Sequence, residues 1–334
     1  MNILIVRLGA LGDIVHAIPA AAAIRRAFPA ARIDWLVEAK HRDVLDLVRG
    51  LDRVLTVPRP TLRGWAEALR AVRAIRYDAA IDLQGLLKSA VLARASGAAR
   101  VIGFSIWHLR EKTARPFYST TGPAAEGEHI IRKNLRLLRA IGVDDDRIEF
   151  PFRAVESAAA ARVREQSGGR RLALINPGAG WPNKRWPPDR FGAAARFVAD
   201  VCGLAPIILW GPGEEALAAE VVAASGGAAM IAPPTHVADL LALAREAALV
   251  VSGDTGPLHL AAAMGAPAVS LFGPTDPQRN GTWSDVDVAV SRFDRCRCRY
   301  ERRCHEREWC LGDVTPAEVS AAIQQRLGSG RDRA

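Results

Sequence analysis

Short glycine-containing segments follow several apolar runs of the sequence, and three of them carry side chains suited to group transfer. The first runs from residue 7 to residue 13 and contains Gly9, Gly12 and Asp13. Glycines allow a tight turn and a close approach of a ligand to the backbone. Asp13 stands where a helix is predicted to begin, and a helix N-terminus stabilises a carboxylate. We interpret Asp13 either as the N-cap of that helix or as an exposed general base.

The second segment spans residues 176–187 and combines Gly178 and Gly180 with Lys184 and Arg185. Backbone N–H groups in such a segment can donate to a phosphate while an ammonium group neutralises its charge. An irregular turn with solvated cations would use the same residues. The segment is therefore a candidate site for a phosphate or a diphosphate.

The third segment, residues 252–259, brings Asp254, Thr255, Gly256 and His259 to the predicted start of another helix. Free N–H groups at a helix N-terminus bind anions, although Asp254 could serve only as the cap. Two candidate phosphate segments in one half of the chain are more informative than either alone.

An acidic pair, Glu214 and Glu215, follows the turn at residues 211–213. A carboxylate placed after a strand can hold the hydroxyl groups of a sugar such as ribose. Acidic residues in a first helical turn also stabilise the helix dipole, so both interpretations stay open.

Apolar runs alternate with helical patterns along the chain, which indicates βαβ units and mostly parallel sheets. Strands are predicted at residues 2–7, 33–37, 54–57, 79–83, 171–176, 206–210, 249–252 and 268–272. Helices are predicted at residues 17–28, 42–48, 62–75, 86–95, 156–165, 191–201, 237–247, 258–264 and 315–327, and from Glu214 onward.

This rhythm starts again near residue 151, which predicts an α/β protein with two Rossmann-like, doubly wound domains facing a central cleft. We assign residues 1–153 to the first domain and residues 154–314 to the second. Residues 315–334 form a final helix and a frayed tail. In such sheets ligands bind beyond the carboxyl ends of the strands, so the chemistry should lie in loops from both domains.

The composition is that of a globular protein, with 49% hydrophobic and 24% charged residues, which argues against disorder and coiled coil. No apolar run approaches the ~18 residues of a membrane span, and no signal peptide is recognisable, so we expect a cytoplasmic protein. Residues 1–150 hold 24 Lys and Arg against 16 Asp and Glu, whereas residues 151–334 hold 21 against 20. The basic first half favours an anionic partner, or serves solubility alone.

Four of the five cysteines lie close together in the sequence, at Cys296, Cys298, Cys304 and Cys310. Four thiolates could hold a structural Zn²⁺, but the spacing C-x-C-x5-C-x5-C is not a standard paired one. In a chain expected in the cytoplasm, reduced free thiols are the preferred interpretation.

Taken together, these segments resemble glycosyltransferase family 9, the ADP-heptose:lipopolysaccharide heptosyltransferases. The resemblance runs over nearly the whole chain and is closest to the heptosyltransferase I branch. The residues that carry it are Leu8, Gly12 and Asp13, residues 82–89, 112–118 and 184–187, residues 253–260, and residues 272–277. It implies a GT-B fold whose last helix returns to the first domain. It also implies an inverting, metal-independent transfer that requires no cofactor, with an ADP-sugar as the donor substrate.

The resemblance implies a role for individual residues. Asp13 matches the general base, Lys184 a lysine at the donor diphosphate, and Glu214 or Glu215 an acid that holds the ribose. Asp254, Thr255, Gly256 and His259 match donor-site residues of the second domain. The implied acceptor is a Kdo-bearing lipid A precursor at the inner face of the inner membrane. The basic residues that could contact it in the first domain are Arg59, Arg63, Arg100, Lys112 and Arg115.

Two departures concern the subclass. At residues 179–180 the heptosyltransferase I pattern prefers hydroxyl residues, so the backbone amide of Gly180 would serve here. The cysteine segment looks more like heptosyltransferase II.

The alternatives are a family member with another nucleotide-sugar or acceptor, a nucleotide-sugar epimerase, and, remotely, a nucleic-acid-binding protein built on the seven arginines between Arg292 and Arg307. Our preferred reading has no nucleic-acid partner, a transient contact with the membrane surface and a monomeric chain.

Overall fold

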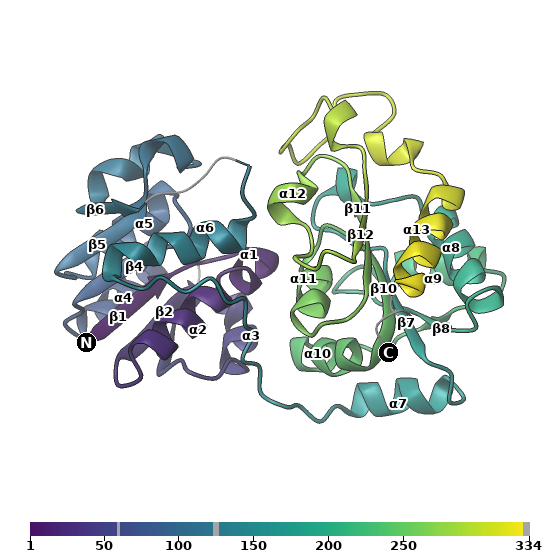
Figure 1. Cartoon of the computed structure of the whole chain (residues 1–334), viewed down its shortest axis with the longest axis horizontal. Coiled ribbons are helices and arrows are strands. Elements are labelled where there is room, and N and C mark those ends of the chain that lie inside the picture. Colours follow the sequence, from purple (N-terminus) through teal and green to yellow (C-terminus); the bar gives the residue numbers. More distant parts are fainter. Residues whose placement is uncertain (59–60, 123–126, 330–334) are drawn as a thin grey trace. The chain divides into compact units, whose positions relative to one another are not determined.

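The first apolar run of the sequence forms strand β1 (Asn2–Val6), in which Ile3, Leu4, Ile5 and Val6 are fully buried. A strand without exposed side chains must be covered on both faces, as in a parallel sheet between two layers of helices. The computed structural model, which describes residues 1–58, 61–122 and 127–329, has this arrangement twice (Figure 1). The chain divides into a first unit, Met1–Arg153, and a second unit, Ala154–Ala334.

The sheet of the first unit has six parallel strands in the order β3-β2-β1-β4-β5-β6. Its other strands are β2 (Arg32–Glu38), β3 (Arg53–Val57), β4 (Ala79–Asp82), β5 (Arg100–Phe104) and β6 (Thr120–Gly122). Its helices are α1 (Leu11–Val15), α2 (Ile18–Ala27), α3 (Arg42–Asp46), α4 (Leu62–Arg73), α5 (Leu87–Ala95) and α6 (Ile130–Leu137).

The second unit repeats the plan with six parallel strands in the order β12-β11-β10-β7-β8-β9. The strands are β7 (Leu172–Asn176), β8 (Ala205–Ile208), β9 (Met230–Ile231), β10 (Ala247–Gly253), β11 (Ala268–Phe272) and β12 (Val288–Ser291). The helices are α7 (Ala158–Gln166), α8 (Pro188–Asp200), α9 (Glu215–Ala224), α10 (Val237–Glu246), α11 (Gly256–Ala263), α12 (Pro277–Asn280) and α13 (Pro316–Gly328).

Both sheets therefore have the Rossmann strand order, which confirms the predicted doubly wound α/β class. The direction of chain progression reverses between β1 and β4 in the first unit, and between β7 and β10 in the second. Such a switch point leaves a crevice at the carboxyl ends of the two strands, where ligands bind. The residues that follow these four strands are thus the first place to look for a site.

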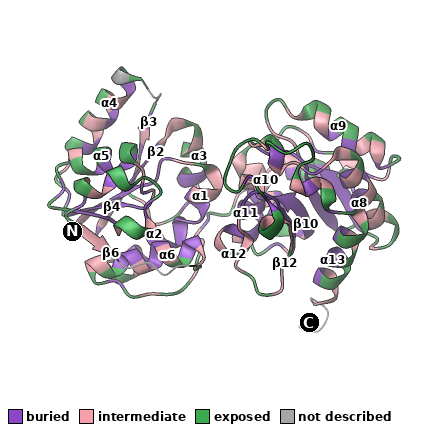
Figure 2. Cartoon of the chain, turned by 90° about the horizontal axis from the view of Figure 1, so that it is seen from above, coloured by how far each residue is buried: buried purple, intermediate pink, exposed green. Residues whose placement is uncertain are grey.

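The core of the second unit has two layers, one on each face of its sheet. Successive residues of β7 point to opposite faces, so Ala173 and Ile175 pack with α8, α9 and α13, whereas Leu172 and Leu174 pack with α7, α10 and α11. Figure 2 shows the buried residues on the strands and on the helix sides that face them.

Helix α13 begins as predicted, because Thr315 caps it and Glu318 completes a capping box. The resemblance predicts that this helix returns to the first unit, and that contact stays a prediction. The buried side chains of α13 include Val319 and Ile323, which belong to the core of the second unit, where the helix packs on α8, β11 and β12. Among the described residues, no helix combines the length and the apolar character needed to cross a bilayer.

Candidate active site

Asn176 ends β7 and joins the loops that follow the two central strands of the second unit. Its amide nitrogen lies 3.1 Å from the carbonyl oxygen of Gly178 and 3.2 Å from the hydroxyl of Ser252. The hydroxyl of Thr255 is 3.1 Å away. One buried amide thus fixes the loop after β7 against the loop after β10, at the switch point.

Asp254, directly after β10, is the hub of the polar cluster beside this junction. Its carboxylate accepts hydrogen bonds from Nζ of Lys184 at 2.6 Å, from Oγ1 of Thr275 at 2.7 Å and from Nε2 of His259 at 3.0 Å. Burial by itself raises the pKa of Asp254, but the hydrogen bond from His259 and the positive charge of Lys184 outweigh it and lower that pKa below its usual value. The carboxylate is therefore ionised and orients three side chains from separate loops.

The N-terminus of α11 lies within this cluster. Thr255 is its N-cap residue without a side-chain cap bond, Gly256 is the first helical residue, and Pro257 follows. The first N–H groups of a helix have no partner within the helix, and they attract an anion together with the helix dipole. The ammonium group of Lys184 is 4.5 Å from the ring centroid of Trp181 and 3.4 Å from the carbonyl oxygen of Asp254. A cation and free amides thus lie together, as a diphosphate requires.

Glu214, rather than Glu215, belongs to this site. Its carboxylate accepts from the backbone N–H of Gly211 at 3.2 Å and pairs with Arg185 at 3.3 Å. A Cβ atom added to Gly178 would stand 2.0 Å from this carboxylate, so the absence of a side chain there makes room for Glu214. Glu215 is exposed on the first turn of α9. Gly180 is exposed, with open space where a Cβ would be.

Asp13 lies in the loop that follows β1 in the first unit. Its carboxylate is 2.8 Å from the guanidinium of Arg7 and accepts from the backbone N–H of Ala10 at 3.3 Å. Ala10, not Asp13, is the N-cap residue of α1, so Asp13 occupies the third helical position and reaches back to the cap. Its side chain remains 35% exposed. The accessible carboxylate of Asp13 is thus paired with the buried guanidinium of Arg7, at the switch point of the first sheet.

The residues after β4 support the loop that carries Asp13. The side-chain oxygen of Gln84 accepts from the backbone N–H of Leu8 at 2.8 Å. Asp82 is completely buried and accepts from Tyr118, Ser89 and the Gln84 N–H, while burial raises its pKa above the usual value. Asp82 therefore builds the turn rather than contacting a ligand.

The basic residues considered for an acceptor do not share one place in the first unit. Arg63 lies on the first turn of α4, which follows β3, and pairs with Glu67. Lys112 and Arg115 follow β5. These three residues therefore lie beyond the carboxyl ends of strands. Arg100 begins β5 and thus stands at the opposite edge of the sheet. Arg59 lies outside the described residues.

The four clustered cysteines are free thiols, with Cys296 and Cys298 buried and Sγ of Cys298 3.5 Å from Sγ of Cys304. Burial and the neighbouring thiol of Cys296 raise the pKa of Cys310 to about 12, which opposes the thiolate that a metal needs. In the part of the chain that the structure describes, no three His, Cys, Asp or Glu side chains are arranged to hold a metal ion. The geometry thus gives the zinc interpretation no support.

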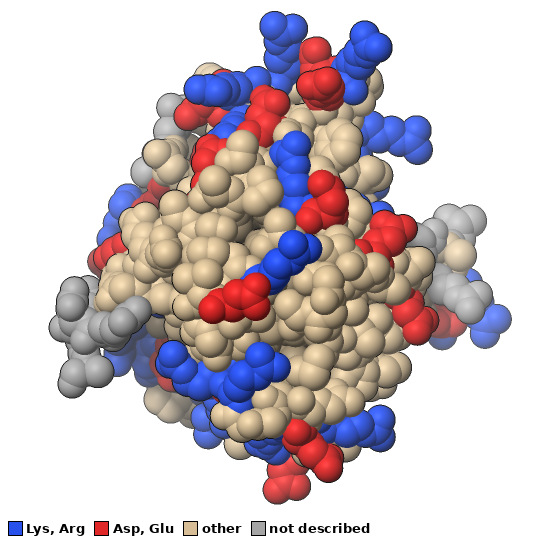
Figure 3. All heavy atoms as spheres, turned by 90° about the vertical axis from the view of Figure 1, so that its right-hand side faces the viewer, with Lys and Arg blue, Asp and Glu red and all other residues tan. Residues whose placement is uncertain are grey.

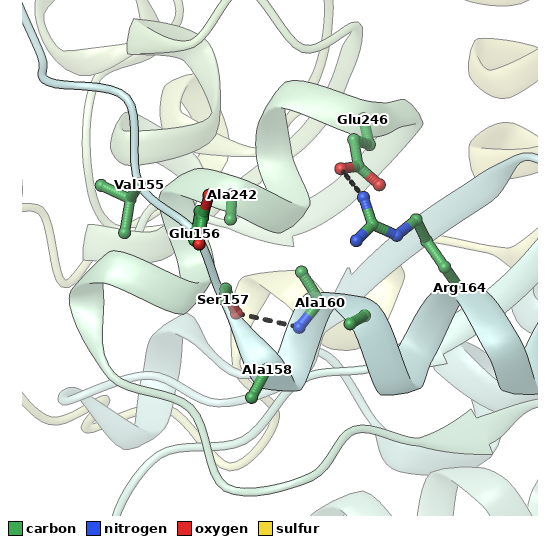
Figure 4. A pocket seen from close by; sticks show the side chains of 9 residues that line it. Val155, Glu156, Ser157, Ala158, Ala160, Arg164, Ala242 and Glu246 are labelled. Carbon is green, nitrogen blue, oxygen red and sulfur yellow. Dashed lines mark hydrogen bonds and ion pairs between the residues drawn. The ribbon is translucent and has the colours of Figure 1, made fainter.

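A hollow of about 490 Å³ lies elsewhere in the second unit, between α7 and α10 (Figure 4). Arg164 and Glu246 pair across it at 2.6 Å, and the hydroxyl of Ser157 accepts from the N–H of Ala160. Its lining residues include neither Asp254 nor any residue that contacts Asp254. On the face shown in Figure 3, acidic and basic side chains are interspersed, without a field of one sign.

Known proteins resemble this chain in sequence and in fold. The model of glycosyltransferase family 9 (heptosyltransferase) matches residues 65–310. Lipopolysaccharide heptosyltransferase 1 of Pseudomonas aeruginosa is 29% identical, over 98% of this chain and 98% of its own. The structure of E. coli heptosyltransferase WaaC with ADP has a TM-score of 0.74 at 24% identity and covers 100% of this chain and 99% of that one. E. coli ADP-heptose lps heptosyltransferase II has a TM-score of 0.77 at 21% identity, covering 99% and 100%.

These likenesses confirm the GT-B fold, and the family model spans well over half of the sequence. The polar clusters described above stand at the two switch points of that fold. The chain is therefore a glycosyltransferase and belongs to glycosyltransferase family 9, the heptosyltransferases.

Proposed function

We propose that this protein transfers a heptose, with inversion at the anomeric carbon, from an ADP-activated donor to a Kdo-bearing lipid A acceptor during assembly of the lipopolysaccharide inner core. The observation that carries the proposal is the cluster in which Lys184, fixed by ionised Asp254, stands beside the N-terminus of α11. Relatives named lipopolysaccharide heptosyltransferase 1 support the sugar, and the E. coli WaaC structure with ADP supports the nucleotide.

The second unit holds the donor in this proposal. The ammonium of Lys184 and the free N–H groups near Gly256 take the diphosphate, because both are already oriented before the ligand arrives. Glu214 accepts hydrogen bonds from the ribose hydroxyls with the carboxylate that Arg185 and Gly211 position. His259 and Thr275 act through Asp254, which keeps Lys184 in place.

The first unit supplies the base and the acceptor contacts. The acceptor hydroxyl attacks the anomeric carbon opposite to the departing ADP, the glycosidic C–O bond forms as the C–O bond to ADP breaks, and the hydroxyl proton passes to Asp13. Since the carboxylate of Asp13 is paired with Arg7, it takes the proton late, as the attacking oxygen becomes positive. Arg63, Lys112 and Arg115 contact the anionic acceptor.

In this proposal the enzyme works as a monomer at the cytoplasmic face of the inner membrane, without a metal or another cofactor. A transfer assay with ADP-heptose, with UDP-sugars and with and without a Kdo-lipid A acceptor tests it. We expect release of ADP only when both ADP-heptose and acceptor are present, unchanged by EDTA, and a product of inverted anomeric configuration by NMR. Turnover of a nucleotide-sugar without acceptor would instead identify an epimerase. Preference for a UDP-sugar would overturn the assigned donor.

A further inference from the structure

The turn that follows β5 presents the most exposed large apolar side chain among the described residues. Trp107 is 80% exposed and Ile106 beside it is 39% exposed. The turn itself is anchored: Leu109 is buried against Gly85, and the hydroxyl of Ser105 is 2.9 Å from Nδ1 of His108. Trp107 is therefore held outward by an ordered turn, and its exposure calls for a function.

Two cationic residues, Arg110 and Lys112, follow Trp107 closely in the sequence. Arg110 and Lys112 are exposed, and no ion pair is formed by either within the described part of the chain. The one acidic residue of the turn, Glu111, is engaged, because its carboxylate accepts from the backbone N–H of Leu87 at 2.7 Å. That bond places the N-terminus of α5 next to the turn, where Leu87 is 40% exposed.

The apolar surface continues along α5. Val91 lies one helical turn beyond Leu87, on the same face, and is 37% exposed. In the first unit as drawn in Figure 1, the short helical turns after β5 lie beside α5, in agreement with the packing of residues 112–117 on that helix. We call Ile106, Trp107, Arg110, Leu87 and Val91 the docking patch.

We propose that the docking patch binds the surface of an anionic lipid bilayer. Tryptophan prefers the interface between water and hydrocarbon, where its ring is in apolar surroundings and its N–H stays hydrated. Lys and Arg beside it are attracted by anionic headgroups. A protein partner would need acidic side chains around an apolar pocket, whereas a bilayer surface accepts exposed apolar and basic side chains without a pocket.

The position of the docking patch links it to the chemistry. All strands of the first sheet are parallel, so the carboxyl end of β5 lies at the same edge as the carboxyl end of β1, which Asp13 follows. Docking turns that edge towards the lipid from which a membrane-anchored acceptor projects. This use of the patch rests on the proposed function, but the binding itself does not.

Vesicle flotation of the full chain tests the proposal, with phosphatidylcholine vesicles and with vesicles that also contain phosphatidylglycerol. We expect binding only to the anionic vesicles, and about tenfold weaker partitioning of Trp107→Ser, since one large apolar group is lost. Arg110→Glu should also weaken binding, and salt should reduce it. Val201→Ser removes another exposed apolar side chain, 61% exposed in the second unit, and is the matched control.

Equal binding of Trp107→Ser and the wild-type chain, or no binding of the wild-type chain to anionic vesicles, would overturn the docking patch. The latter result would point to a protein partner. Transfer to a delipidated, water-soluble acceptor separates the two proposals, because Trp107→Ser should retain it while losing transfer to acceptor embedded in vesicles. Vesicle binding without any transfer would leave the patch intact and refute the proposed function. Circular dichroism confirms that each variant is folded.

Discussion

The guanidinium of Arg7 lies 2.8 Å from the carboxylate of Asp13, and the two side chains differ sharply in exposure, at 7% for Arg7 and 35% for Asp13. Arg7 is fixed from behind, because its guanidinium donates to the carbonyl oxygen of Leu83 and its own carbonyl oxygen accepts from the indole N–H of Trp35 at 3.1 Å. Arg7, a buried cation in a fixed position, therefore holds the accessible carboxylate of Asp13 in the loop that follows β1.

If this carboxylate is the base, Asp13→Asn should reduce kcat by about 10²- to 10⁴-fold, the range for loss of a general base. The amide preserves the size of the side chain, and Asp13 lies outside the second unit, so the Kd for ADP should stay within about twofold. Steady-state kinetics and titration calorimetry measure the two quantities. Near wild-type turnover would remove Asp13 from the mechanism.

Lys184→Ala should weaken ADP binding by about ten- to hundredfold, because a charge-assisted contact to the diphosphate contributes about 1.5–3 kcal/mol. Arg164→Ala removes a cation from an exposed pair of the same unit, remote from Asp254, and should leave the Kd unchanged. The melting temperature is recorded for both, since Lys184→Ala also leaves Asp254 with fewer partners. Equal effects of the two substitutions on ADP binding would contradict the assigned donor site.

Gly178→Ala tests the placement of Glu214. The new methyl group would come within 2.0 Å of the Glu214 carboxylate, which can swing away because it ends a flexible side chain. We expect a folded protein with several-fold weaker binding of the nucleoside diphosphate. Gly180→Ala is the matched control, because open space surrounds that position. If both variants bind ADP like the wild-type chain, Glu214 does not hold the ribose.

Glu318 should make the stability of the second unit depend on acid pH. Its pKa is lowered to about 2, by the backbone N–H of Thr315 and then by Arg292. A lowered pKa in the folded state means that the stabilisation is complete above the ordinary value of 4.5 and disappears as the pH falls towards 2. Glu318→Gln should therefore cost on the order of 1 kcal/mol at pH 7 and almost nothing near pH 2. Urea unfolding at several pH values measures this, and a pH-independent cost would disprove it.

The clustered cysteines give a prediction of a different kind. Since the described thiols are not arranged as metal ligands, the purified protein should contain no stoichiometric zinc or iron. Elemental analysis together with thiol titration under denaturing conditions measures both, and five titratable thiols are expected. One metal ion per chain would show that the segment rearranges around a metal.

The central strands were predictable because each is a continuous apolar run, and the predicted residues 268–272 coincide with β11. The two edge strands of the second sheet were missed: β9 has two residues, and β12 is only partly buried, so neither carries the pattern of a buried strand. No helix or strand was predicted between residues 96 and 150, where β5, β6 and α6 form.

The candidate site was predictable where one loop carries its own signal, as with Lys184 and Asp254. Hydrogen bonds between side chains of different loops were not predictable from the sequence. Thr275 donates to Asp254 across 21 residues, and Asn176 reaches Thr255 across 79. Arg7 was not singled out, although it follows β1 directly and is almost fully buried. Only tertiary packing shows that these side chains meet.

Burial of α13 in the second unit has a consequence for engineering. Residues 154–329 belong to the second unit from their first to their last residue, so the described backbone passes between the units a single time, at Arg153 and Ala154. One crossover point is therefore sufficient to exchange a whole half with that of a relative, and such hybrids would leave each hydrophobic interior native.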